Sequence, residues 1–125
     1  MIAFVTIGTN NLKISSKFYD KILFPLGIIQ IESDERYVGY AKKNTPDKIE
    51  LYIMKPYNKS IASIGNGTMI AFLAESKEIV NKFHVIGLEN GALDEGTPGP
   101  RHRNDYYAYI RDLDGNKICA YSKNL

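Results

Sequence analysis

Few side chains of this sequence can act as a nucleophile or a general base near neutral pH. Cys119 is the single cysteine, and the two histidines are His84 and His102. An imidazole can activate a thiol for covalent catalysis, but the spacing of these residues gives no support for such a pair. A lone cysteine in a strand is usually a small apolar filler, and we expect His84 to be a partly exposed helix residue. His102 is the better acid–base candidate, because it lies in a loop just before the last two strands.

The segment 106–121, YYAYIRDLDGNKICAY, is the most informative part of the chain. Two runs of strand-forming residues flank the turn residues of DLDGN, so the segment predicts a β-hairpin. Its RDLDGNKI stretch resembles the D-P-D-G-N-x-I/L-E signature of the vicinal oxygen chelate superfamily, which includes glyoxalase I, bleomycin-resistance proteins and extradiol dioxygenases. Leu113 replaces the usual proline, and Cys119 stands where the metal-binding glutamate would be. Similar matches, FVTIGTNNLKISSKFYDKILFPLG and GNGTMIAF, extend the resemblance over nearly the whole chain.

The hydrophobic periodicity predicts two helices and eight strands. The first helix begins near Asn10 and Asn11 and ends at Pro25, and the second begins after Ser76 and ends at Asn90. We expect strands at 3–8, 28–32, 37–41, 48–54 and 68–74, a weak strand near residue 93, and the two arms of the hairpin. Residues 96–101, GTPGPR, are expected to form a loop.

The order β-α-β-β-β therefore occurs twice and indicates an α+β fold. The first module spans about residues 1–56, a polar connector about 57–67, and the second module about 68–125. The resemblance implies the same architecture, in which two βαβββ modules form a curved, mostly antiparallel sheet. The helices then cover the outer face, and the other face forms a concave cup.

The resemblance also implies four metal-ligand positions in this cup, typically His, Glu, His and Glu. They correspond to Phe4, Glu50, Met69 and Cys119. The strand alternation agrees, since it directs toward the helices an apolar set made of Val5, Ile7, Ile49, Leu51, Ile70, Phe72, Ile118 and Ala120. Phe has no donor atom, and one carboxylate with two sulfurs does not suit Zn, Ni, Fe or Mn. We therefore expect no metal and no other cofactor.

What remains is a cup whose lining is aromatic with a few polar atoms. Such a lining suits a small organic molecule, held by stacking and one or two hydrogen bonds. Glu50 and His102 are the candidates for acid–base chemistry, and Glu50 can alternatively orient an amine. The predicted ligand-binding residues are Phe4, Thr6, Tyr52, Met69, Tyr106, Tyr107, Cys119 and Tyr121.

Three functional hypotheses follow. In the first, the protein is a glyoxalase/bleomycin-resistance-like protein that binds a small organic molecule without metal. In the second, it is a glyoxalase-like lyase or isomerase of the lactoylglutathione lyase type, or a dioxygenase-related enzyme. This hypothesis must explain how a transition-state charge is stabilised without a metal. In the third, the fold serves as an interaction module through its sheet edges.

Composition limits the partners and the compartment. Sixteen Lys and Arg against fourteen Asp and Glu give a net charge of +2, which does not indicate a nucleic-acid or membrane surface. The longest apolar region, 22–31, is broken by Pro25 and Gly27 and is shorter than the ~20 residues that cross a bilayer. One cysteine cannot form an internal disulfide, and the N-terminus lacks a signal-peptide pattern, so we expect a cytoplasmic protein. By analogy with small members of the superfamily, we expect a homodimer paired through sheet edges.

Overall fold

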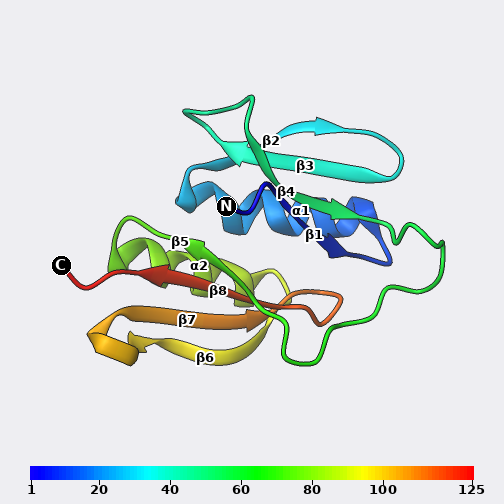
Figure 1. The fold of residues 1–125 in the computed structure, drawn as a ribbon. Helices are drawn as coiled ribbons and strands as arrows, with labels where there is room; N and C mark the ends of the chain where they lie inside the picture. The colour runs from blue at the N-terminus through cyan, green and yellow to red at the C-terminus, as the bar shows by residue number, and fades with distance from the viewer.

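The computed structural model describes all 125 residues, and its elements repeat the order β-α-β-β-β (Figure 1). The first module contains β1 (Val5–Gly8), α1 (Leu12–Leu23), a 3-10 turn (Phe24–Leu26), β2 (Ile28–Ser33), β3 (Tyr37–Lys42) and β4 (Ile49–Met54). The second contains β5 (Ile70–Leu73), α2 (Lys77–Glu89), β6 (Leu93–Pro100), a 3-10 turn (His102–Asn104), β7 (Tyr106–Arg111) and β8 (Lys117–Ser122). The predicted α+β class and the repeated order are therefore confirmed.

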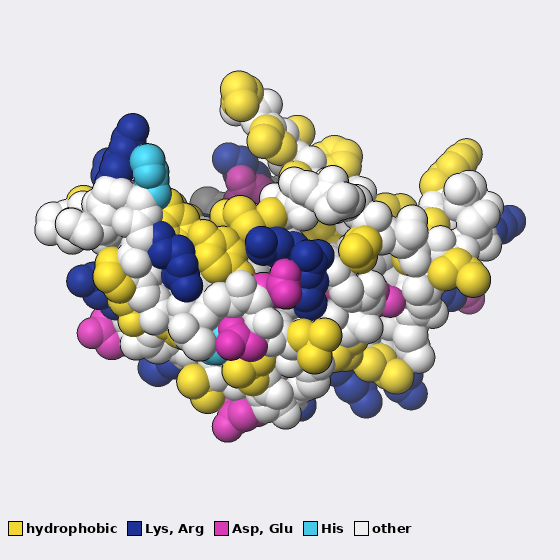
Figure 2. Space-filling model, turned by 90° about the horizontal axis from the view of Figure 1, so that it is seen from below, with side chains coloured by type: hydrophobic (Ala, Val, Ile, Leu, Met, Phe, Trp, Pro, Cys, Tyr) yellow, Lys and Arg dark blue, Asp and Glu magenta, His cyan; other side chains and the backbone are white.

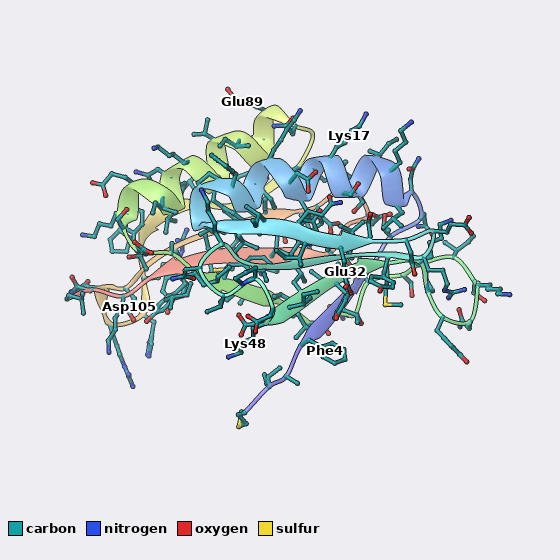
Figure 3. All side chains as sticks on the ribbon, turned by 90° about the horizontal axis from the view of Figure 1, so that it is seen from above. Phe4, Lys17, Glu32, Lys48, Glu89 and Asp105 are labelled. Carbon is teal, nitrogen blue, oxygen red and sulfur yellow. The ribbon has the colours of Figure 1, made fainter.

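The strands form two four-stranded sheets. Sheet one has the order β1-β4-β3-β2, and sheet two has the order β5-β8-β7-β6. In each sheet the first pair is parallel and the other two pairs are antiparallel. Both helices lie on the same side of the sheets, and Phe4 points to the opposite side (Figure 3). We call that opposite side the open face.

Local sequence explains where the helices begin and end. The Asn11 side chain accepts a hydrogen bond from the Ile14 amide at 3.1 Å, and the Ser76 side chain accepts one from the Ile79 amide at 3.3 Å. Both are the N-caps that the sequence predicts. Gly27 and Gly91 follow the helical segments with φ of 74° and 101°, a conformation that glycine adopts without steric cost. Neither helix is long and apolar enough to span a membrane.

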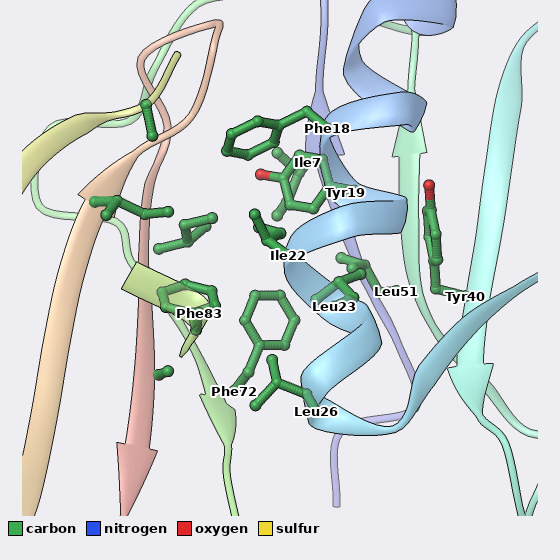
Figure 4. Packing of buried hydrophobic residues seen from close by; sticks show 14 of the residues in the cluster. Ile7, Phe18, Tyr19, Ile22, Leu23, Leu26, Tyr40, Leu51, Phe72 and Phe83 are labelled. Atoms are coloured by element: carbon green, nitrogen blue, oxygen red, sulfur yellow. The ribbon is translucent and has the colours of Figure 1, made fainter. Parts of the chain in front are cut away.

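The core lies between the helices and the sheets (Figure 4). Tyr19 and Ile22 of α1 and Phe83 of α2 are fully buried there. The predicted inward-facing strand residues Ile7, Leu51, Phe72, Ile118 and Ala120 belong to this core, and Val5 and Ile70 pack against it. Burial of each large apolar side chain contributes about 1.5–3 kcal/mol, so alternation along the strands determines which face the helices cover.

Three local predictions are wrong. A register shift between Tyr40 and Ala41 interrupts the pairing of β3 with β4, and Ile49 then contacts Gly39 beside Tyr52 instead of joining the core. The expected loop at 96–101 is mostly strand, since β6 extends to Pro100 with two register shifts. His84 is buried, and its Nε2 lies 3.0 Å from Asp94 Oδ1. A bulge adds one residue to a strand, so the residues beyond it point to the opposite face from the one that simple alternation predicts. For His84, the hydrogen bond with Asp94 offsets the cost of burying the imidazole.

The turn between β7 and β8 fastens the second module to the first. Asp114 accepts hydrogen bonds from the Thr9 hydroxyl at 2.6 Å and from the Asn10 amide at 2.9 Å. Asn116 Nδ2 donates to the Gly8 carbonyl at 3.0 Å. We call these contacts the turn lock. The conformation of the turn is set by Asp112, whose Oδ1 accepts the amides of Asp114 and Asn116, both at 2.9 Å.

Asp112 also joins the turn lock to the core. It is only 5% exposed, and its Oδ2 accepts the Tyr19 hydroxyl at 2.5 Å. Burial, followed by the charge of Asp112, raises the pKa of Tyr19 well above its usual value, so this phenol stays a donor. The DLDGN sequence is therefore a structural element in which two carboxylates bind amides and hydroxyls from both modules.

Replacing Asp112 with Ala should destabilise the protein by about 2 kcal/mol or more, because two amides and the Tyr19 hydroxyl lose a charged acceptor. Urea unfolding curves measure this change. Tyr19→Phe should lower the free energy of unfolding by less, since it removes only the hydrogen bond between the Tyr19 hydroxyl and Asp112 and the phenylalanine ring leaves no unpaired polar atom. Asp47→Ala, at an exposed carboxylate, is the matched control and should change stability by no more than about 0.5 kcal/mol. Equal midpoints for the Asp112 and Asp47 variants would contradict this account.

Candidate functional site

On sheet one, the open face carries three aromatic rings in edge-to-face contact. The Phe4 and Tyr52 centroids are 5.3 Å apart at 82°, and those of Tyr37 and Tyr52 are 5.4 Å apart at 76°. Phe4 is 55% exposed, and it projects from the sheet on the side away from the helices (Figure 3). The positions predicted for Phe4 and Tyr52, on the face opposite the helices, are thus observed. Such contacts stabilise each pair by about 0.5–1.5 kcal/mol and keep the rings in a defined arrangement.

On sheet two, the open face carries two cross-strand rows of side chains. One row runs Leu73, Tyr121, Tyr107, and the other runs Ala71, Cys119, Tyr109. The Tyr107 and Tyr121 centroids are 5.0 Å apart, and the Tyr107 and Tyr109 rings stack at 5.9 Å. Three tyrosine rings therefore form a second aromatic cluster.

Asp105 fixes the position of the Tyr121 ring. The Tyr121 hydroxyl donates to Asp105 Oδ2 at 2.7 Å, and the Asn124 amide donates to Oδ1 at 2.7 Å. Both donors lower the pKa of Asp105, and the Asn124 amide has the larger effect. The hydrogen bond from the Tyr121 hydroxyl to Asp105 also raises the pKa of Tyr121. The carboxylate thus stays charged and the phenol stays protonated, which keeps the ring in place against Tyr107.

A cavity of about 380 Å³ lies where sheet one meets β5 of sheet two. Ten of its twelve lining residues are hydrophobic, and the two charged ones are Glu50 and Lys42. We call it the seam cavity; its lining residues are Val5, Leu26, Ile28, Tyr40, Ala41, Lys42, Glu50, Leu51, Ile70, Ala71, Phe72 and Leu73. It reaches the open face because Leu73, which is 69% exposed, is on its lining. Two larger hollows of about 480 and 430 Å³, near the β1–α1 junction, have mainly polar linings.

Glu50 is the single carboxylate on the lining of the seam cavity. It lies beside the register shift of β4, and its Oε1 is 3.8 Å from Lys48 Nζ. Both side chains are at least half exposed, so this ion pair contributes little to stability. The Lys48 ammonium therefore holds the Glu50 carboxylate only weakly.

The residues present do not fit a divalent metal. No three His, Cys, Asp or Glu side chains come together anywhere in the structure. Of the four positions where the resemblance implies ligands, Phe4 packs on Tyr52, Met69 lies just before β5, and Cys119 is fully buried. Glu50 alone has an oxygen donor, and one carboxylate does not make a Zn, Ni or Mn site.

The remaining predicted site residues occupy different environments. Thr6 is exposed on β1 and lines a small hollow of about 160 Å³ with the connector between the modules. Tyr106 does not face the open face, because its hydroxyl donates to Asn81 of α2 at 2.9 Å and its ring packs against the core. His102 is exposed in the 3-10 turn before β7, and its side chain has no hydrogen bond to Glu50 or Cys119. The structure therefore does not pair His102 with either group.

Several residues that shape the open face were not predicted from the sequence. Tyr37 and Tyr109 could have been predicted from strand alternation. Tyr37 lies two residues before Gly39 on β3, and Tyr109 lies two residues after Tyr107 on β7, so each shares the open face with that neighbour. Arg101 and Lys117 were missed as well. The guanidinium of Arg101 lies 5.1 Å from the Tyr109 centroid, and Lys117 Nζ lies 5.2 Å from it. No local sequence pattern indicates that the Arg101 side chain folds back onto β7.

Known structures share this fold. A crystal structure of a glyoxalase/bleomycin resistance protein from Albidiferax ferrireducens T118 is 38% identical, covers 98% of both chains and has a TM-score of 0.87. A glyoxalase-related enzyme from Fulvimarina pelagi is 15% identical over 98% of this chain and 88% of that chain, with a TM-score of 0.76. A glyoxalase/bleomycin resistance protein/dioxygenase family enzyme from Burkholderia phytofirmans PsJN is 17% identical over 97% of both chains, with a TM-score of 0.73. The last two likenesses concern the fold alone.

No family model matches the sequence, and no curated protein matches it either. The identity and coverage of the Albidiferax structure nevertheless define the family. The chain belongs to the glyoxalase/bleomycin resistance protein family, within the superfamily that the sequence resembles.

Cys119 should be unreactive in the native protein. It is fully buried, and burial raises the pKa of its thiol to about 11, compared with about 8.5 for a free cysteine. At pH 7.5 a disulfide reagent should therefore modify it at least about a hundredfold more slowly than free cysteine, and the rate should rise with pH. In guanidinium chloride one thiol per chain should react at once, which is the control. Stoichiometric modification of the folded protein within seconds would show that Cys119 is an activated nucleophile.

Proposed function

We propose that the protein binds a small organic molecule at the open face, with an apolar part of that molecule in the seam cavity, and that it does so without a metal. The volume and lining of this cavity carry the proposal. A volume of about 380 Å³ with ten hydrophobic lining residues falls within the ~300–1,000 Å³ of ligand sites, which combine apolar walls with a few polar groups. Glu50 and Lys42 supply those polar groups.

The aromatic clusters extend the binding surface beyond the cavity. Leu73 and Ala71 line the seam cavity and are also the β5 members of the rows that contain Tyr121 and Tyr109. A ligand whose apolar end occupies the cavity can therefore stack on the Tyr121 and Tyr107 rings. The ring contacts and the Tyr121–Asp105 hydrogen bond fix these side chains in advance, which lowers the entropy cost of binding.

A lyase or isomerase activity is the second candidate, and the position of Glu50 favours it. A carboxylate beside an apolar cavity can act as a general base if a substrate removes it from water. However, such catalysis depends most on stabilising the anion that develops in the transition state, and the negatively charged Glu50 cannot provide this stabilisation. Ligand binding without turnover is therefore the function that we put forward.

A thermal-shift screen of small aromatic and aliphatic compounds tests the proposal. A compound that binds only the folded protein must raise the melting temperature. The most effective compounds should lose at least about tenfold in affinity in Ala71→Phe, because a large ring fills the seam cavity. Ala62→Phe, in the connector, is the matched control and should bind normally. Unchanged affinity in Ala71→Phe would place the site elsewhere.

The same screen on protein incubated with Zn, Ni or Mn separates the two candidate functions. We expect no metal to remain after desalting and no change in the ligands found. One equivalent of metal that survives desalting and is absent from Glu50→Gln would overturn the metal-free proposal and favour the lyase.

We also propose that the protein is a homodimer. The residues just before β1 expose the apolar side chains of Met1, Ile2 and Phe4. Neighbouring apolar side chains exposed on a surface are a common site of chain pairing. Sedimentation at micromolar concentration should show a dimer, and Ile2→Asp should shift it toward monomer. Tyr57→Asp, at an exposed ring in the connector, should leave the dimer intact; a wild-type monomer would refute the proposal.

A further inference from the structure

The open face of sheet two carries two cations without carboxylate partners. Lys117 and Arg101 lie over the Tyr109 ring, at 5.2 and 5.1 Å from its centroid. Neither belongs to one of the three ion pairs of the structure, and Lys117 Nζ makes no hydrogen bond. Figure 2 shows dark blue Lys and Arg side chains on both sides of a yellow patch on the surface of this module.

Arg101 is held in place by the backbone. Its Nη1 donates to the carbonyls of Gly99 at 3.2 Å and Tyr107 at 2.8 Å, and its Nη2 donates to Thr97 at 2.7 Å. These neutral acceptors fix the guanidinium, which forms no ion pair, although its charge, after the hydrogen bond with His84, helps to lower the pKa of nearby Asp94. Gly96 makes room for this arrangement, because a Cβ there would lie 2.7 Å from Tyr109 Cδ2 and 3.3 Å from Arg101 Nη2.

The nearby carboxylates are bound to other groups. Glu95 pairs with Arg111 at 2.9 Å, and Asp94 accepts hydrogen bonds from His84 and the Gly96 amide. Asp105 is held by Tyr121 and by the Asn124 amide. None of them makes a hydrogen bond or ion pair with Lys117 or Arg101. The local excess of positive charge over the tyrosine rings is therefore available to an external anion.

We propose that the ligand is an amphipathic anion, whose apolar part occupies the seam cavity and whose carboxylate or phosphate group binds Lys117 beside the Tyr109 ring, with the positive charge of Arg101 on the other side of that ring. This inference rests on the proposed function and narrows it to a ligand class. In the sheet order β5-β8-β7-β6, Lys117 on β8 is one inter-strand step from the β5 side of the cavity and Tyr109 on β7 is two steps away, or about 5 and 10 Å at about 4.8 Å per step. The Tyr121 and Tyr107 rings lie in the neighbouring row, beside this path. Lys117 supplies three free donors, and Arg101 supplies a fixed positive charge.

Three probes that differ only in their polar end group test this inference: 4-phenylbutyrate, 4-phenyl-1-butanol and 4-phenylbutylamine. NMR titration of the whole protein should give the tightest binding for the carboxylate, at least about fivefold tighter than the alcohol, with affinity that falls as salt rises. Lys117→Gln should weaken binding of the carboxylate about fivefold or more and leave binding of the alcohol within about twofold. Lys82→Gln, an equal charge change on the exposed side of α2, is the matched control and should alter neither.

The outcomes separate this inference from the proposed function. If the alcohol binds as tightly as the carboxylate, or if Lys117→Gln binds the carboxylate as the wild type does, the anionic class is wrong while the small-molecule function stands. Tightest binding of the amine would also refute the anionic class, and it would point to Glu50 as the polar partner. If none of the probes binds and the compound screen also finds no ligand, both proposals fail.

Discussion

The hydrogen bonds of the turn lock hold the two modules in one orientation, and the geometry of the open face depends on them. The two sheets share no backbone ladder, so their relative position is set by the packing of α1 against α2 and by the contacts of the β7–β8 turn. Asp114 binds the β1–α1 junction while Asp112 binds Tyr19 in the core. Charged acceptors in a partly buried site make stronger hydrogen bonds than neutral ones. These contacts bring β5 close to sheet one, but no backbone hydrogen bonds form between the two sheets. The space left between them is the seam cavity.

Most of the fold could be predicted, because its determinants are local. The alternation in β1, β5 and β8 is unbroken, so Ile7, Phe72 and Ile118 could be assigned to the core, and the caps at Asn11 and Ser76 have clear sequence patterns. Prediction failed where a tertiary contact overrides a local preference. Ile49 follows a register shift that only the pairing with β3 reveals, and His84 is buried because Asp94, ten residues away, supplies its partner.

The candidate site was less accessible to sequence reasoning, because its main features come from residues far apart in the chain. Parity alone places Tyr107 and Tyr121 on the open face, and a stricter use of parity would have excluded Tyr106 and included Tyr109. The fixed position of Arg101 depends on three carbonyls from β6 and β7, and no motif encodes that arrangement. The seam cavity likewise results from the approach of two modules, so its volume had no sequence signal.

The side chains of the core pack against the helices, whereas those of the open face do not. The core and the turn lock use the helix side of the sheets and the β7–β8 turn, whereas Phe4, Tyr37, Tyr52 and Tyr107 lie on the side that the helices do not cover. Exposed side chains there, such as Phe4 and Met69, can change without opening a cavity in the core, whereas the fully buried Cys119 cannot. Packing therefore does not demand the rings and cations of this face. The tyrosine rings of this face are half-buried against one another, and Phe4 is the exposed ring among them, so their arrangement is set by contacts between neighbouring strands and not by the helices.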